Sequence, residues 1–194
     1  MSIPAHLEKP VHAKGLADIK ALLLDVDGVL TTGEIIYGAP VSDDGSPQGT
    51  AFEIKAFSVK DGLGLRMALD AGVKVAVVTG RASAALNARL DNLGLDPRLR
   101  FDGVKDKAAV VSRLEEVLET GRKSMAFLAD DLPDLPLLAL VGAPLAVADA
   151  HPEVISRALM VTRNPGGRGA VREVCEALVR ARGQWDTVMR RYGL

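Results

Sequence analysis

The stretch LLLDVDGVLTTG (residues 22–33) joins an apolar run to two aspartates, Asp25 and Asp27, that are separated by one small residue. A buried strand can end without carboxylates, and two carboxylates this close together repel each other. Residues i and i+2 of an extended chain point to the same side, so both carboxylates can face one site. The stretch therefore predicts a strand that ends at a site with a use for two negative charges.

Outward from this stretch, short apolar runs alternate with amphipathic segments. The apolar runs indicate strands over 21–24, 73–79, 125–129, 145–148 and 159–162. Apolar residues at helical spacing indicate helices near 63–71, over about 86–94, over 106–119 and from 170 toward 190. Residues 34–37 and 52–57 are typical of a hairpin around a long loop, 38–50. The alternation predicts an α/β fold, a doubly wound (Rossmann-like) parallel sheet with helices on both faces, a small β-hairpin flap (34–57) and no cap domain.

Composition narrows the classes of protein that the chain can belong to. The 194 residues are 48% apolar and 25% charged, which suits a single domain over 20–194 after a flexible extension, 1–19. The net charge of −1 gives no electrostatic footprint for nucleic acid or an anionic membrane, so neither is expected as a partner. A single cysteine, Cys175, and the lack of a signal-peptide pattern lead us to expect a cytoplasmic protein without an internal disulfide.

Polar residues follow several of the predicted strands. Thr79, Gly80 and Arg81 follow the run 73–79, and Asp130 follows the run 125–129. Lys107 opens the helix that precedes the second of these runs. Each pattern alone is typical of an ordinary turn or a surface residue. Because ligands of open α/β sheets bind at the carboxyl ends of the strands, the set together predicts one site there.

The residue types at this site fit phosphoryl chemistry. Asp25, Asp27 and Asp130 offer hard oxygen donors of the kind that Mg²⁺ prefers, and a divalent cation offsets the repulsion among carboxylates. The Thr79 hydroxyl and the Gly80 N–H can bind phosphoryl oxygens, and a lysine such as Lys107 can stabilise their charge in the transition state. One carboxylate can then attack phosphorus while the other gives a proton to the leaving oxygen.

These motifs resemble those of the haloacid dehalogenase (HAD) superfamily of phosphatases. The segment 25–31 is similar to its first motif, and Thr79 and Lys107 stand for its second and third. Asp130, Asp131 and Asp134 resemble its fourth motif, and all four motifs occur in order.

The resemblance implies a role for each of these residues. Asp25 would be the nucleophile that forms an aspartyl phosphate, and Asp27 the general acid and base. Mg²⁺ would be held by the side chains of Asp25 and Asp130 and by the carbonyl of Asp27. Asp131 and Asp134 would orient these ligands.

A narrower resemblance covers nearly the whole chain after residue 20. The segments AFSVKDGLG (56–64), TGR (79–81), VADAHP (147–152) and GGRGAVREVCE (166–176) are similar to those of the 3-deoxy-D-manno-octulosonate 8-phosphate phosphatase family. That resemblance implies hydrolysis of a sugar-acid phosphate in lipopolysaccharide biosynthesis by a capless homotetramer. Neighbouring subunits or C-terminal tails (165–194) would close each site. The residues that would bind substrate are Lys60, Asp61, Gly62, Gly80, Arg81, Arg89 and Arg168.

The sequence departs from this family's pattern in places, and other classes stay open. Lys60 replaces an arginine, Ala129 replaces a glycine, and the loop 38–50 is long. Related nonulosonate 9-phosphate phosphatases tend to have glutamate where Arg81 and Arg168 stand, so the two arginines favour the octulosonate enzyme. A receiver domain of two-component signalling and a non-catalytic assembly module of a cytidylyltransferase system remain the other interpretations.

Overall fold

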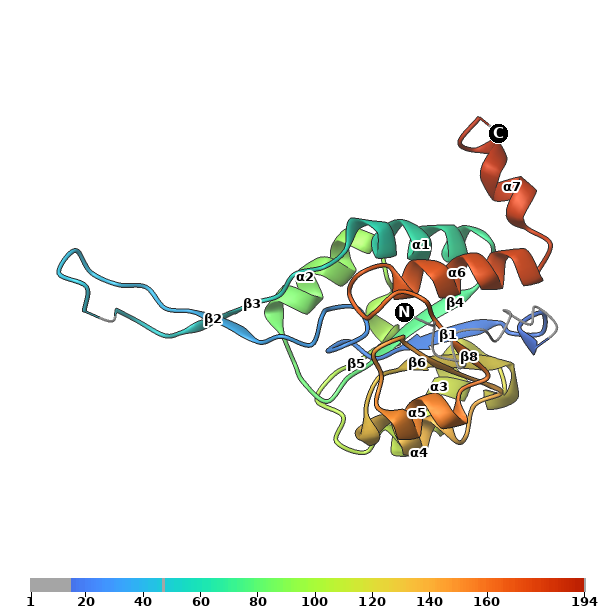
Figure 1. Ribbon diagram of the computed structural model, residues 1–194, viewed down its shortest axis with the longest axis horizontal. Coiled ribbons are helices and arrows are strands. Elements are labelled where there is room, and N and C mark those ends of the chain that lie inside the picture. The colour runs from blue at the N-terminus through green and yellow to red at the C-terminus, as the bar shows by residue number, and fades with distance from the viewer. Residues whose placement is uncertain (1–14, 47, 194) are drawn as a thin grey trace, which may run out of the picture.

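The fold is built on one parallel sheet (Figure 1). The computed structural model describes residues 15–46 and 48–193, and within them six strands pair in the order β5-β4-β1-β6-β7-β8. In chain order these strands are β1 (Ala21–Leu24), β4 (Lys74–Val78), β5 (Arg100–Phe101), β6 (Met125–Ala129), β7 (Ala143–Ala146) and β8 (Met160–Val161). Every residue of β1 and β6 is buried, as expected for strands that helices cover on both faces. The predicted doubly wound fold is confirmed.

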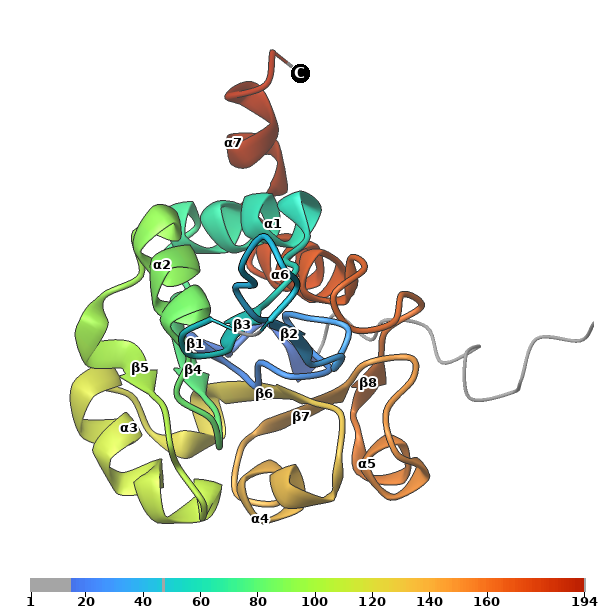
Figure 2. The ribbon, with the colours of Figure 1, turned by 90° about the vertical axis from the view of Figure 1, so that its left-hand side faces the viewer.

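Helices cover both faces of this sheet (Figure 2). The helices α1 (Val59–Asp70), α2 (Ala84–Leu93) and α6 (Ala170–Ala181) lie on one face. The helices α3 (Val111–Leu118), α4 (Leu135–Leu138) and α5 (Pro152–Arg157) lie on the other. In the part of the chain that the structure describes, none of the helices has the length and apolar character needed to cross a membrane.

The register of the central strands places their carboxyl ends level with one another. Leu24 pairs with Val77 of β4 on one side and with Leu128 of β6 on the other. The chain leaves β1 toward one face of the sheet and leaves β6 toward the other. A crevice therefore opens between these two strand ends, which is the usual ligand position in this class of fold.

The hairpin of β2 (Ile36–Gly38) and β3 (Phe52–Ile54) projects away from the body (Figure 1). The strands are antiparallel, and Tyr37 pairs with Glu53. Its two strands have three residues each and are shorter than the predicted strands 34–37 and 52–57. Its apolar side chains are largely exposed, among them those of Ile36, Tyr37 and Phe52.

Several helices begin or end at other residues than the sequence predicts, because local contacts and turns at the helix ends set these boundaries. Helix α1 begins four residues earlier than expected because Ser58 caps it by accepting a hydrogen bond from the Asp61 N–H. The segment predicted as one helix over 106–119 starts with a 3₁₀ turn, η4 (Lys107–Val110). The last predicted helix is two helices, α6 and α7 (Trp185–Arg190), because the chain turns at Gly183 with a φ of 66°.

Both ends of the described chain contribute more to the core than the sequence suggested. Leu16 and Ile19 are buried, so the packed domain begins within the stretch expected to be a loose extension, whose residues 1–14 lie outside the described part. Helix α6 buries Val174 and Leu178 completely against the body. Within the predicted tail, 165–194, helix α6 is therefore packed into the domain, and α7 is the part that projects (Figure 2).

A glycine turn just before α6 supports the loop that follows β1. The Gly167 N–H donates a hydrogen bond to the Val29 carbonyl over 2.8 Å. A Cβ atom on Gly166 would lie 1.7 Å from the carbonyl oxygen of Gly28, so only a glycine allows this approach. The C-terminal part of the chain thus fixes the backbone that carries Asp25 and Asp27.

We predict that Gly166→Ala displaces this loop. The added methyl group meets backbone rather than a flexible side chain, so we expect a loss of about 1–3 kcal/mol in the free energy of unfolding. Gly121→Ala is the matched control, because a Cβ atom there meets nothing within 4 Å. Urea denaturation followed by circular dichroism measures both variants, and equal stabilities of the two would contradict the contact.

Candidate active site

Lys107 occupies the centre of the crevice between β1 and β6. Its ammonium lies 2.6 Å from Asp25 Oδ1 and 2.5 Å from Asp134 Oδ1. All three side chains are buried, with exposed fractions of 6%, 9% and 2% for Lys107, Asp25 and Asp134. Burial alone would lower the pKa of Lys107, but the two carboxylates together raise it. The lysine is therefore a fixed positive charge beside Asp25.

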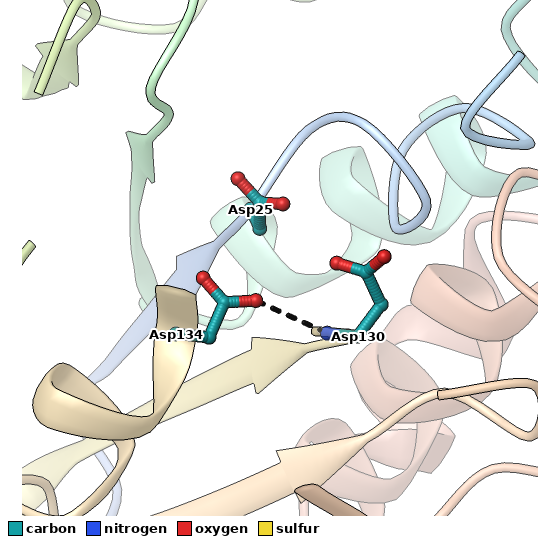
Figure 3. A group of neighbouring side chains, drawn as sticks. All are labelled: Asp25, Asp130 and Asp134. Carbon is teal, nitrogen blue, oxygen red and sulfur yellow. Dashed lines mark hydrogen bonds between the residues drawn. The ribbon is translucent and has the colours of Figure 1, made fainter. Parts of the chain in front are cut away.

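Asp130 follows β6 and brings a further carboxylate to Asp25 (Figure 3). Oxygens of Asp25, Asp130 and Asp134 all lie within 4.8 Å of one another. Burial, followed by the charge of Asp25, raises the pKa of Asp130 to about 8. Burial and the nearby Asp134 raise the pKa of Asp25 to about 6, although Lys107 acts in the opposite direction. When ionised, these three carboxylates carry more negative charge than Lys107 alone neutralises.

Asp134 and Asp131 are engaged with the protein itself. Asp134 accepts from Lys107 through one oxygen and from the backbone N–H groups of Asp130 and Asp131 through the other. Figure 3 shows the bond from the Asp130 N–H. Asp134 thereby ties the turn after β6 to Lys107. Asp131 is exposed and accepts from the N–H of Leu132. Asp25 and Asp130 are thus the carboxylates left to bind a cation, and hard oxygen donors around uncompensated negative charge fit Mg²⁺.

The other wall of the crevice comes from the end of β4. Thr79 is buried, and its hydroxyl accepts from the Arg81 N–H over 3.3 Å. A cleft of about 360 Å³ brings together the predicted residues Asp25, Asp27, Thr79, Gly80, Arg81, Lys107, Asp130, Asp131 and Asp134. This volume suits a small molecule of sugar size. Val104, Lys105 and Pro133 also line the cleft and were not predicted.

Asp27 faces the base of the hairpin. Its Oδ1 accepts from the ammonium of Lys55, and its Oδ2 lies 3.7 Å from Arg81 Nε. Glu53 accepts from Arg81 and lies 3.6 Å from the Lys55 ammonium. Glu53 and Lys55 were not predicted, although their spacing of two residues on a predicted strand places both on one side of it.

The remaining residues predicted to bind substrate lie outside this cleft. Asp61 is buried and accepts from the N–H groups of Gly169 and Arg172 at the start of α6. Its carboxylate therefore anchors α6 to α1, and burial raises its pKa. Gly62 leaves room for Arg89, since a Cβ atom there would lie 2.3 Å from the guanidinium.

Arg89 does not line the cleft that Arg81 lines. Its guanidinium donates to the Ser58 carbonyl and lies 5.9 Å from the centre of the Phe57 ring. Arg81 precedes α2, whereas Arg89 lies within it. Lys60 and Arg168 are exposed.

Known proteins resemble this chain in sequence and in fold. A curated 3-deoxy-D-manno-octulosonate 8-phosphate phosphatase, KdsC of Escherichia coli (strain K12), is 43% identical over 180 residues, or 91% of this chain and 89% of that protein. The crystal structure of a probable YrbI-family phosphatase from Pseudomonas syringae aligns with a TM-score of 0.82 at 37% identity, over 94% of this chain and 97% of that one. No protein-family model matches the chain.

A further solved structure resembles the chain in a ligand-bound state. The 3-deoxy-D-manno-octulosonate 8-phosphate phosphatase of Moraxella catarrhalis, in complex with a magnesium ion, a phosphate ion and a KDO molecule, aligns with a TM-score of 0.81 at 32% identity. The alignment covers 93% of this chain and 97% of that chain. The sheet and its ordered strand-end motifs define a phosphatase of the HAD superfamily. Within it, the chain belongs to the KdsC family of 3-deoxy-D-manno-octulosonate 8-phosphate phosphatases.

We predict that the metal-free protein loses stability as the pH rises. The side chain of an aspartate ordinarily has a pKa of 3.8, and folding raises the pKa of both Asp25 and Asp130 above this value. The folded state therefore binds more protons than the unfolded state between about pH 4 and pH 8. Above this window the two ionised carboxylates lower the free energy of unfolding. Below it, both groups are protonated in the folded and the unfolded state, so they contribute nothing. In chelator, the Tm of the wild type should fall relative to that of Asp130→Asn between pH 5 and pH 8, roughly the span of that window.

Mg²⁺ serves as the internal control of this experiment. Because the cation offsets the repulsion between the carboxylates, it should raise the wild-type Tm more at high pH than at low pH, and it should raise that of Asp130→Asn less. Thermal unfolding monitored by circular dichroism measures all of these values. Parallel Tm curves for the two proteins in chelator would contradict the assignment of charge to this site.

Proposed function

We propose that this protein hydrolyses 3-deoxy-D-manno-octulosonate 8-phosphate to the free octulosonate and phosphate, using Mg²⁺. The observation that carries the proposal is the buried contact of Lys107 with Asp25, next to Asp130. It joins a potential nucleophile, a fixed cation and a cation site in a cleft of sugar size. Membership of the KdsC family supports the substrate.

Asp25 is the proposed nucleophile. An oxygen of its carboxylate attacks phosphorus, the bond from phosphorus to the sugar oxygen breaks, and an aspartyl phosphate forms. Lys107 holds Asp25 in place through the 2.6 Å contact and offers positive charge to the phosphoryl oxygens as their charge redistributes. The Thr79 hydroxyl and the Gly80 N–H, both at the cleft, would bind the same oxygens.

Asp27 is the proposed general acid and base. It gives a proton to the leaving sugar oxygen as the first bond breaks, and it later takes a proton from the water that attacks the aspartyl phosphate. Phosphate leaves, and the Asp25 carboxylate is restored. The more open position of Asp27, with 23% of its side chain exposed against 9% for Asp25, suits exchange of that proton with solvent.

Mg²⁺ would be held by the side chains of Asp25 and Asp130 and by the carbonyl of Asp27. When bound, it would neutralise negative charge between the carboxylates and the phosphoryl group. Asp134 orients Asp130 and Lys107 through the hydrogen bonds already described. Asp131 shapes the turn that follows Asp130 by accepting from the Leu132 N–H.

Arg81 is the proposed residue that recognises the sugar-acid carboxylate. It lies at the cleft, and a guanidinium can bind a carboxylate through two hydrogen bonds. Arginine rather than glutamate at 81 and 168 favours the octulosonate substrate over a nonulosonate 9-phosphate, which is the second candidate. Lys60, Arg89 and Arg168 lie outside the cleft of their own chain, so they would reach substrate from a neighbouring copy or after a rearrangement.

We also propose a cytoplasmic homotetramer that acts in lipopolysaccharide biosynthesis. The projecting hairpin exposes Ile35, Ile36, Tyr37, Phe52 and Ile54, which is unfavourable for an isolated chain and suits packing against copies of itself. Neighbouring subunits would close the cleft, and the projecting α7 is the part of the predicted tail that is available for this.

Phosphate release tests the proposed reaction. We expect the wild type to release phosphate from the octulosonate ester faster than from a nonulosonate 9-phosphate, and to stop in chelator. Asp25→Asn should abolish turnover because no nucleophile remains, and Asp27→Asn should lower kcat by about 10²–10⁴. Asp102→Asn, at an exposed carboxylate, is the control. Turnover by Asp25→Asn near the wild-type rate would exclude this mechanism.

Light scattering after size exclusion tests the proposed assembly. The wild type should have four times the mass of one chain. The double variant Tyr37→Asp, Phe52→Asp should have the mass of one chain, because charges on the hairpin oppose its packing. Leu159→Asp, at an exposed apolar residue beside β8, should stay tetrameric. A tetrameric double variant would show that the hairpin does not hold the assembly.

A further inference from the structure

The ion pairs around Asp27 form a second charged cluster, separate from the one around Lys107. Lys55 and Arg81 supply two positive charges, and Asp27 and Glu53 supply two negative ones. The charges balance, unlike those around Asp25 and Asp130. The cluster joins the loop after β1, the strand β3 with the residue that follows it, and the turn that follows β4.

Lys55 is the most enclosed member of this cluster. Its side chain is 2% exposed, although Lys55 directly follows a hairpin that is otherwise open to solvent. Withdrawing an ammonium from water is costly unless carboxylates compensate for the lost hydration. Asp27 and Glu53 do so here, and the hydrogen bond from Lys55 to Asp27 fixes one oxygen of that carboxylate.

The two oxygens of Asp27 therefore have different surroundings. Oδ1 is held by Lys55, while Oδ2 lies 3.7 Å from Arg81, beyond hydrogen-bonding distance. Oδ2 is the oxygen left to exchange a proton with a substrate in the cleft.

We propose that Lys55 is a positioning residue for the acid step, holding Asp27 so that its free oxygen faces the leaving group. The inference rests on the proposed function, since it requires Asp27 to act as the general acid. Lys55 itself contacts Asp27 and Glu53 and acts through Asp27.

The dependence of the rate on the leaving group tests this role. Breaking the ester of a primary alcohol needs a proton on the leaving oxygen, whereas p-nitrophenolate leaves without one. We expect Lys55→Met to lower kcat/KM for a hexose 6-phosphate by about 10² or more, and that for p-nitrophenyl phosphate by less than about tenfold. Lys55→Arg, which keeps a cation, should recover most of the loss on the hexose ester.

Lys123→Met is the matched control, since Lys123 is exposed at the opposite end of the sheet, before β6. It should leave both rates unchanged. Glu53→Gln removes the charge of one partner of Lys55, so it should also lower kcat/KM more for the hexose ester than for p-nitrophenyl phosphate, but by less than Lys55→Met does. If Lys55→Met does not fold, Glu53→Gln tests the role of Lys55 in its place. The hexose ester carries no carboxylate, so a changed Arg81 cannot produce the difference through sugar-acid recognition.

The outcomes separate this inference from the proposed function. Equal losses on the two esters, or no loss on either, would overturn the role of Lys55 even if the wild type cleaves the octulosonate ester rapidly. A wild type that prefers other sugar phosphates would overturn the proposed substrate and leave the leaving-group comparison intact. A wild type that cleaves no ester would overturn both.

Discussion

The ion pairs of Lys107 with Asp25 and Asp134 set the conditions for the rest of the structure. Three charges are buried there, and removing one member would leave another without a partner, which typically costs several kcal/mol. The same contacts connect three chain segments that come from both halves of the sheet. Lys107 also packs against the ring of Phe127, 6.0 Å from its centre, so the charged site rests directly on the core.

Around this fixed centre, the loop after β1 is held by backbone contacts on one side and by charges on the other. The glycine turn before α6 contacts its backbone, and Lys55 holds one oxygen of the Asp27 carboxylate. Asp25 is thus rigidly placed and enclosed, while Asp27 lies where the hairpin meets the body. This difference fits the proposed roles, in which Asp25 attacks phosphorus from a fixed position and Asp27 exchanges protons.

The sequence predicts those features that depend on neighbours along the chain. Asp25 and Asp130 could be assigned because each follows an apolar run of strand length, and strand ends of a parallel sheet share one edge. The sequence could not place Asp61, because its partners, Gly169 and Arg172, are brought near by the packing of α6 on α1. The position of Arg89 could not be predicted for the same reason, since its contact with Ser58 depends on how α2 lies against α1.

The dependence of the loop after β1 on the turn before α6 affects how the protein is made. Asp61 and Gly169, which anchor that turn, are separated by 108 positions in the chain. At about 5–20 residues per second, a ribosome needs roughly 5–20 s to add that stretch. During this interval the nascent chain carries Asp25 and Asp27 on a loop without its backbone support. Hydrolytic competence is therefore expected to arise late in synthesis, after the strands of the sheet have emerged.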